Sequence, residues 1–163
     1  MLESSPSAPI PSPTKRPFVF GQWVSRTFNF VYVFVSCVLL VFWPFAVNHW
    51  GIGPRTGWLL LAMLGDLLIV QGCKHVFYVH RPGKTAQFLW GRHPHSGFPS
   101  GHTFPAFLLA TMIWEAHPTL WFWFAGAALI AWARWQQRAH FGWQVSLSAL
   151  LGTALGLLAG RWL

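Results

Sequence analysis

The sequence predicts an all-α protein, a polytopic membrane bundle of about five transmembrane helices. Of its 163 residues, 54% are hydrophobic and only 9% are charged, whereas soluble globular domains average about 25% charged residues. The apolar residues gather into runs that cross or nearly cross the roughly 30 Å of hydrocarbon in a bilayer. Most of the twelve tryptophans fall near the ends of these runs, as expected for the aromatic belts at two membrane surfaces.

The chain divides into an N-terminal tail and a membrane domain. Residues 1–26 begin with a segment rich in Pro and Ser that cannot bury enough apolar surface to fold, so we expect a disordered or interfacial tail. Residues 27–163 contain all the apolar runs and form the predicted membrane domain. Its first run, Phe28 to Val47, carries no charge and has the length of one membrane crossing.

Four further apolar runs complete the predicted bundle. The second run carries Asp66. A charged residue inside a membrane span has either a functional or a structural role. The third and fourth runs are short for a crossing and are joined at His117 and Pro118. The fifth repeats glycine every four residues, which lets another helix pack closely. The expected spans after the turn at Asn48–Thr56 are Gly57–Val76, Thr103–Ala116, Thr119–Ala133 and Trp143–Leu163.

The charge balance indicates an anionic partner. Eleven Lys and Arg residues face only three acidic residues, and the formal net charge is +8. The cations lie in short connections between apolar runs, which favours phosphate groups or lipid headgroups as partners over nucleic acid. We therefore expect a membrane lipid partner and no nucleic acid, and the oligomeric state is left open.

The segment Phe98-Pro99-Ser100-Gly101-His102 has the features of a helix start that binds an anion. Ser100 is a candidate N-cap, and the apolar run beginning at Thr103 follows directly. Unpaired backbone N–H groups and the positive end of the helix dipole converge at such a site, and Gly101 allows close approach. His102 would stand there with a proton to donate. The alternative is an ordinary capped helix with an incidental histidine.

Two other connections carry the remaining polar chemistry. Lys74 is followed after six residues by Arg81 and Pro82. Arg134 is followed after five residues by His140, and Gln144 comes four positions later. If five helices cross the membrane, both connections lie on the same face as the N-terminal tail.

These three patterns, Lys-x6-Arg-Pro, Pro-Ser-Gly-His and Arg-x5-His, resemble in type and order the signature motifs of the type 2 phosphatidic acid phosphatase superfamily. The resemblance covers Lys74 to Gln144. It implies a membrane phosphatase that hydrolyses a lipid-linked phosphate or diphosphate monoester, phosphatidate-like or a polyprenyl diphosphate, through a phosphohistidine. It also implies that no metal and no other cofactor takes part.

The resemblance assigns a role to each motif residue. His140 matches the nucleophile, and His102 matches the acid that protonates the leaving oxygen. The matching phosphate cradle consists of Lys74, Arg81 and Arg134, completed by Ser100 and the N–H of Gly101. Such a cradle suits phosphoryl transfer, because the enzyme must neutralise charge spread over three oxygens.

The third motif departs from the family pattern at two positions. Ala133 stands where the family usually has Ser, and Gln144 stands where an Asp usually orients the nucleophile. If residues 140 and 144 lie one turn apart on a helix, Gln144 Oε1 accepts the Nδ1–H of His140 and fixes its tautomer. Gln followed by Val at this place resembles the dolichyl-diphosphatase branch of the superfamily.

Two other functions and the membrane face remain open from the sequence. The protein is alternatively a lipid phosphotransferase, or a non-catalytic membrane protein that binds lipid phosphates. Nine of the eleven cations lie on the expected site face, which by the positive-inside rule would be cytoplasmic. The family usually has its site on the opposite face, external or lumenal. Many of these cations belong to the expected catalytic site, so their position is a poor guide to the cytoplasmic face. We therefore expect a protein of the bacterial plasma membrane with its site on the external, periplasmic face.

Overall fold

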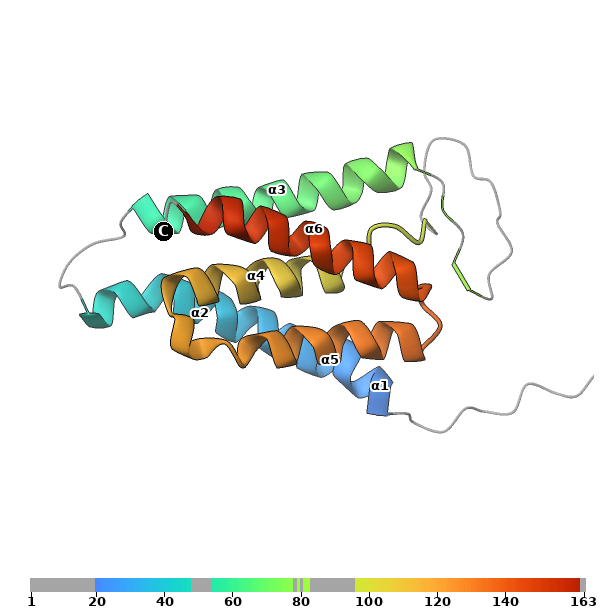
Figure 1. Cartoon of the computed structure of the whole chain (residues 1–163), viewed down its shortest axis with the longest axis horizontal. Helices are drawn as coiled ribbons and strands as arrows, with labels where there is room; N and C mark the ends of the chain where they lie inside the picture. The colour runs from blue at the N-terminus through green and yellow to red at the C-terminus, as the bar shows by residue number, and fades with distance from the viewer. Residues whose placement is uncertain (1–19, 48–53, 78, 80, 83–95, 162–163) are drawn as a thin grey trace, which may run out of the picture.

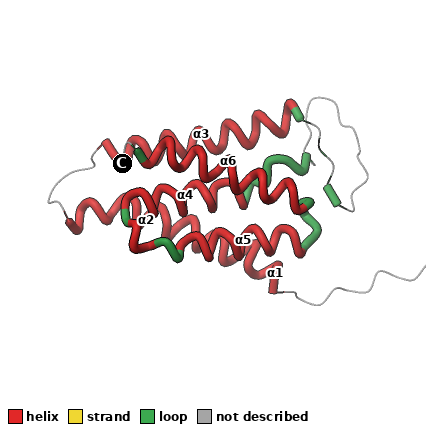
Figure 2. The backbone as a smooth tube through the Cα atoms, in the orientation of Figure 1, coloured by secondary structure: helices red, strands yellow, loops and turns green. Residues whose placement is uncertain are grey.

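The computed structural model describes residues 20–47, 54–77, 79, 81–82 and 96–161. Its described part is entirely helix and connecting loop, without a strand (Figures 1 and 2). Five long helices lie side by side and alternate in direction along the chain (Figure 1). The prediction of an all-α bundle is therefore confirmed.

The first of these helices is continuous although it contains three segments. A short α-helical turn leads into a π-helical turn and then into a long α-helix, and the backbone stays right-handed helical at both junctions. We refer to residues 20–47 as the first helix. The elements are α1 (Phe20–Trp23), the π-helix η1 (Val24–Phe28), α2 (Asn29–Val47), α3 (Pro54–Val76), α4 (Thr103–Ala116), the 3-10 helix η2 (Pro118–Leu120), α5 (Trp123–Gln136) and α6 (Gly142–Gly160).

Three predicted boundaries need correction. The first helix begins at Phe20 and not at Phe28, so residues 20–26 of the predicted tail are helical; residues 1–19 lie outside the described part. Helix α3 begins at Pro54, inside the predicted turn, because proline is well suited to the first position of a helix. Helix α5 begins at Trp123 and not at Thr119, because the chain after His117 first forms a 3-10 turn. The division into tail and membrane domain otherwise stays a prediction.

The outer surface of the bundle is suited to lipid. In the part of the chain that the structure describes, three helical segments are long and apolar enough to cross a membrane: Phe20–Leu40, Gly57–Val76 and Gly142–Gly160. Large apolar side chains are exposed along them, including Phe30 at 70%, Leu60 at 65% and Leu150 at 67%, and such a surface requires a lipid environment. Helices α4 and α5, each of 14 residues, are only about 21 Å long at 1.5 Å per residue, as their short apolar runs predict.

Helix α4 forms the centre of the bundle and packs most extensively against α6. Phe104, Leu108 and Met112 of α4 are almost fully buried. The glycine stripe of α6 faces them: a Cβ atom at Gly152 would collide with the carbonyl oxygen of Phe104, and one at Gly156 would lie 2.6 Å from Thr111 Cβ. The stripe therefore sets how closely α4 and α6 approach, as its spacing predicts.

A buried polar network ties the first helix to α4 and α5. The hydroxyl of Tyr32 lies 3.2 Å from the carbonyl oxygen of Ala106 and 3.1 Å from that of Trp123. Trp123 Nε1 donates to Ser36 Oγ at 2.7 Å, and Ser36 Oγ donates to the Tyr32 carbonyl at 2.7 Å. Buried polar groups stabilise a fold only when they are paired, so this network holds the first helix in one position against the bundle.

The glycine stripe yields a test of this packing. We expect Gly152→Ala to lower the unfolding free energy by about 1 to 3 kcal/mol, because the added methyl group meets backbone atoms that cannot move aside. The measurement is the thermal unfolding midpoint of the purified protein in detergent. Gly65→Ala in α3 is the matched control, since a Cβ there has nothing within 4 Å. Equal effects of the two substitutions would contradict the assigned role.

Candidate active site

The three sequence motifs lie at the same end of the bundle. The end of α3, the beginning of α4 and the connection from α5 to α6 all lie there, together with the start of the first helix (Figure 1). This arrangement follows from the alternating directions of the five helices. The shared face that the span count predicts is therefore confirmed, although the sequence contained no evidence that the motifs meet.

The backbone of Ser96 to Ser100 connects the first motif with the other two. Arg81 donates to the Ser96 carbonyl from Nε at 3.2 Å and from Nη2 at 3.1 Å. Ser96 is fully buried, and its hydroxyl donates to the carbonyl of Phe77 at 2.8 Å. The N–H of Gly97 donates to the Val79 carbonyl at 2.7 Å. These bonds hold the segment against the chain that leaves α3. Arg81 therefore has a structural role in addition to supplying a positive charge.

His140 is held by the next carbonyl of the same segment. Its Nδ1 lies 2.6 Å from Gly97 O, and the side chain is only 2% exposed. A carbonyl oxygen can only accept, so Nδ1 carries the proton and the lone pair of the neutral ring is on Nε2. The partner of Nδ1 is therefore a backbone carbonyl, where the sequence predicted Gln144.

Gln144 acts at the beginning of α6. His140 precedes this helix and does not share it with Gln144, because Phe141 is the N-cap residue. Gln144 Oε1 accepts the N–H of Phe141 at 3.1 Å, which is half of a capping box and satisfies one N–H at the helix end. Gln144 also contributes a hydrogen bond to His140. The predicted geometry is thus wrong in its helical register, and Gln144 supports His140 largely through the backbone beside it.

The start of α4 differs in detail from the predicted helix start. The helix begins at Thr103 with His102 at the N-cap position, and the Thr103 N–H donates to Ser100 Oγ at 3.4 Å, which is the bond that a capping serine makes. Ser100 is fully buried: its N–H donates to Ser148 Oγ at 2.8 Å, and its hydroxyl donates to Thr103 Oγ1 at 3.0 Å. Ser100 is thus engaged with the protein. The N–H groups of Gly101 and His102 have no partner within the described part of the chain and remain donors for an anion.

Lys74 stands directly beside this helix start. A Cβ atom at Gly101 would lie only 3.3 Å from Lys74 Nζ. Lys74 lies in the last turn of α3, so two helix ends bring an ammonium group and exposed backbone N–H groups together. This combination is suited to bind phosphate oxygens.

The spacing of Arg134 and His140 has a structural reason. Helix α5 ends in a Schellman motif, in which the N–H of Arg138 donates to Trp135 O at 2.9 Å and the N–H of Ala139 to Arg134 O at 3.1 Å. Arg138 adopts the left-handed conformation that the motif needs, with a φ of 51°. The turn reverses the chain between Arg134 and His140, and so brings the cation and the imidazole to the same site.

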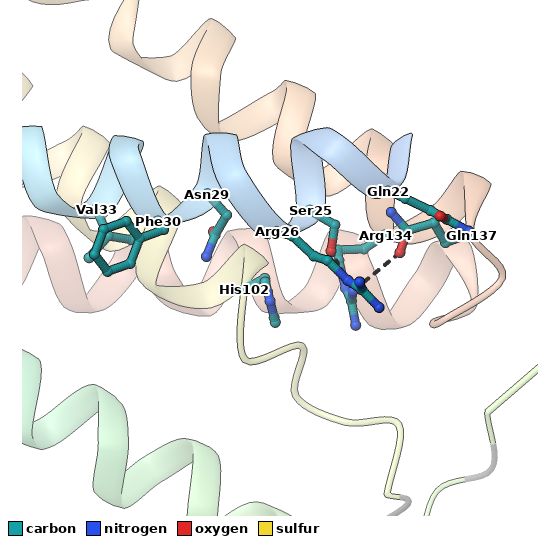
Figure 3. Close-up of a pocket in the computed structure, with 9 residues that line it drawn as sticks. All are labelled: Gln22, Ser25, Arg26, Asn29, Phe30, Val33, His102, Arg134 and Gln137. Atoms are coloured by element: carbon teal, nitrogen blue, oxygen red, sulfur yellow. Dashed lines mark hydrogen bonds between the residues drawn. The ribbon is translucent and has the colours of Figure 1, made fainter. Parts of the chain in front are cut away.

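Arg134 is held by the first helix, a contact that the sequence did not predict. Its Nη1 donates to Ser25 Oγ at 2.7 Å and lies 3.4 Å from Gln137 Oε1 (Figure 3). Gln137 Nε2 in turn donates to the carbonyl of Gly21. Ser25 is 4% exposed. No motif identified Ser25, Gly97 or Ser148, because a serine in an apolar run and a backbone carbonyl have no sequence signal of a catalytic role.

The electrostatics of the site favour neutral imidazoles in the absence of substrate. Burial lowers the pKa of His102 to about 4, and the positive charges of Arg134, Lys74 and Arg81 act in the same direction. Burial also lowers the pKa of His140 to about 4, although its hydrogen bonds with the Gly97 carbonyl and with the Gln144 side chain favour the protonated form. An anion that offsets the cations would raise both values.

One further buried polar residue lies within the apolar run of α3. Asp66 of α3 is 8% exposed, and its Oδ1 has no hydrogen-bond partner in the described structure. It precedes Lys74 by two helical turns. Among the residues that the structure describes, no group of three or more His, Cys, Asp or Glu side chains is arranged to hold a metal ion.

Comparison with known proteins identifies the family. The family model of the PAP2 superfamily matches residues 55–163, which include α3 to α6 and all three motifs. Neither a curated protein nor a solved structure matches the chain. The match covers two thirds of the sequence and includes every residue of the cluster except Ser25 and Gly21 of the first helix. This all-helical membrane protein therefore belongs to the PAP2 superfamily, whose members are phosphatases that act on phosphate esters.

Proposed function

We propose that the protein hydrolyses a phosphate or diphosphate monoester of a membrane lipid through a phosphohistidine on His140, without a metal ion. The observation that carries this proposal is the hydrogen bond from His140 Nδ1 to the Gly97 carbonyl. It leaves the ring lone pair on Nε2, as a nitrogen nucleophile requires. The charges of Arg134 and Arg81 act on the same ring, so a bound phosphate would lie close to this nitrogen.

The reaction follows from the groups at the site. His140 Nε2 attacks phosphorus, the bond from phosphorus to the leaving oxygen breaks, and His102 protonates that oxygen. Water then attacks the phosphohistidine, with His102 accepting the proton, and phosphate leaves. Lys74, Arg81 and Arg134, with the N–H groups at the start of α4, neutralise the three phosphoryl oxygens during both steps.

His102 gains the proton that it donates when substrate binds. In the ligand-free protein its pKa is about 4, so at neutral pH the ring is neutral. A phosphate group beside Lys74 and Arg134 offsets the charges that disfavour protonation, and the pKa rises toward its ordinary value of about 6.5. Protonation of the acid is thereby coupled to occupancy of the site.

The lipid substrate is proposed from the position of the site. The cluster lies at one end of helices whose outer surfaces are apolar, so a phosphate group can reach it from the headgroup level of a bilayer. We propose the external face of a plasma membrane, which is the usual arrangement of the family. Phosphatidate-like and polyprenyl diphosphate substrates both have a monoester phosphate of this kind.

The decisive experiment measures phosphate release by the purified protein in detergent with a chelator present. Phosphatidate, a prenyl phosphate and a prenyl diphosphate are compared, and release from at least one of them supports the proposal. Phosphate recovered on an added acceptor lipid would indicate a phosphotransferase. Binding without release from any substrate would indicate a non-catalytic lipid-phosphate-binding protein, and activity lost only in chelator would contradict the metal-independent mechanism.

Substitutions of the two histidines should affect turnover in different ways. We expect His140→Ala to abolish the phosphoenzyme and turnover on every substrate. We expect His102→Ala to slow a lipid monophosphate, whose leaving alkoxide needs a proton, by about 10²- to 10⁴-fold, the usual contribution of a general acid. The loss on p-nitrophenyl phosphate should be much smaller, because its leaving group needs little protonation. Rapid-quench trapping of labelled phosphoenzyme and initial rates provide the measurement. An equal loss on both substrates in His102→Ala would contradict its role as the acid.

Gln144 should make a moderate contribution to kcat. We expect Gln144→Ala to lower kcat by roughly 10-fold. Removing a residue that hydrogen-bonds to a functional histidine usually lowers activity by about 10- to 100-fold, and the loss should be at the low end because Gly97 already sets the tautomer. Gln144→Glu should retain or raise kcat, because its carboxylate accepts the same Phe141 N–H and adds a charge that favours phosphorylated imidazolium. If both variants match the wild type while His140→Ala is inactive, Gln144 does not support the nucleophile.

Phosphate binding should be linked to protonation of His102. We expect saturating inorganic phosphate to raise the pKa of His102 from about 4 by about one unit or more, because the anion offsets neighbouring cations. Phosphate should therefore bind more tightly as the pH falls through the pKa of the complex. Histidine NMR titrations with and without phosphate measure the shift, and His117, at the opposite end of α4, is the internal control. An unchanged His102 titration would contradict the coupling.

A further inference from the structure

A pocket of about 660 Å³ lies between the first helix and the catalytic cluster (Figure 3). His102 and Arg134 line one side of it, and the polar side chains of the first helix line the other. Phe30 and Val33 lie at one end, and Gln22 and Gln137 lie at the other (Figure 3). His140 does not line this pocket, so the pocket is on the side of the proposed acid. It therefore lies where a leaving group would be.

The first helix is a fixed wall of this pocket. Ser25 Oγ accepts from Arg134 Nη1 at 2.7 Å, and the Gly21 carbonyl accepts from Gln137. A Cβ atom at Gly21 would meet the side-chain ends of Gln136 and Gln137, so these two side chains at the end of α5 pack over the first helix there. None of these first-helix residues lies in the segment that the family model matches. The family match therefore assigns no role to this wall.

The chemistry of the pocket is suited to an anion that also forms hydrogen bonds. Arg26 and Arg134 contribute two cations, and the described lining contains no acidic side chain. Two buried polar atoms at the pocket, Asn29 Oδ1 and Arg134 Nε, have no hydrogen-bond partner among the described residues. Unpaired buried polar groups are costly. An oxygen of an anionic ligand would accept from Arg134 Nε, and a hydroxyl of the ligand would donate to Asn29 Oδ1.

We propose that this pocket binds the leaving group of the substrate, and that Arg26 selects a leaving group with a second phosphate. The substrate class is then a lipid diphosphate monoester. This inference rests on the proposed function. His140 Nε2 attacks the terminal phosphorus, the bridging P–O bond breaks, and the lipid monophosphate leaves with the bridging oxygen. That oxygen takes its proton from His102, and water later releases the terminal phosphate from His140. Phe30 and Val33 lead from the second phosphate toward the lipid chain.

The test compares two substrates with the same lipid chain, a monophosphate and a diphosphate. We expect Arg26→Gln to lower kcat/KM for the diphosphate by about 10-fold, the value of one charge-assisted hydrogen bond at a partly exposed site, with a clearly smaller loss for the monophosphate. Arg26→Lys should restore part of the loss. Arg161→Gln, at the end of α6 far from the site, is the matched control and should change neither substrate.

A binding measurement separates this inference from the proposed function. Calorimetry of inorganic diphosphate and inorganic phosphate with the purified protein requires no turnover. If Arg26→Gln weakens diphosphate binding by about 10-fold and leaves phosphate binding unchanged, the result supports the pocket. This holds even if no substrate is hydrolysed, because absence of hydrolysis would overturn only the proposed function. Hydrolysis of both substrates with equal effects of Arg26→Gln, or with none, would overturn the inference and leave the proposed function standing.

Discussion

The hydrogen bond between His140 Nδ1 and the carbonyl of Gly97 is the contact on which the site depends. It joins the third motif to the buried segment Ser96 to Ser100, whose other polar groups are held by Arg81 and Ser148. An unpaired buried carbonyl costs about 1 to 3 kcal/mol, so each partner keeps this segment in place. The same bonds that satisfy the backbone also determine which nitrogen of His140 can react.

The bundle brings these groups together with few residues because helix ends do most of the positioning. Lys74 lies in the last turn of α3, Gly101 and His102 precede α4, and Arg134 lies in the last turn of α5. The close approach of α4 and α6 at Gly152 fixes the central pair of helices. Packing in the middle of the bundle thus determines the geometry at its end, where the polar chemistry lies.

The site is electrostatically incomplete without an anion. Lys74, Arg81 and Arg134 act on both histidines in the same direction as burial, and like charges near one another are costly in a partly buried site. A phosphate group removes this cost and supplies acceptors for the N–H groups at the start of α4. In the proposed mechanism, binding energy and activation of the acid have the same origin, because one ligand charge would stabilise the complex and permit protonation of His102.

The sequence by itself determined the helical membrane bundle, because long apolar runs with very few charges fold as helices in lipid, where every backbone N–H and C=O needs an internal partner. It also identified the three motifs, because Lys, Arg and His at fixed spacings carry recognisable chemistry. Only the tertiary structure decided where the first helix begins, since Phe20 to Val24 is held by contacts to α5, and which group orients His140. A backbone carbonyl such as Gly97 has the same chemistry in every residue, so no sequence pattern distinguishes it; its role comes from position alone.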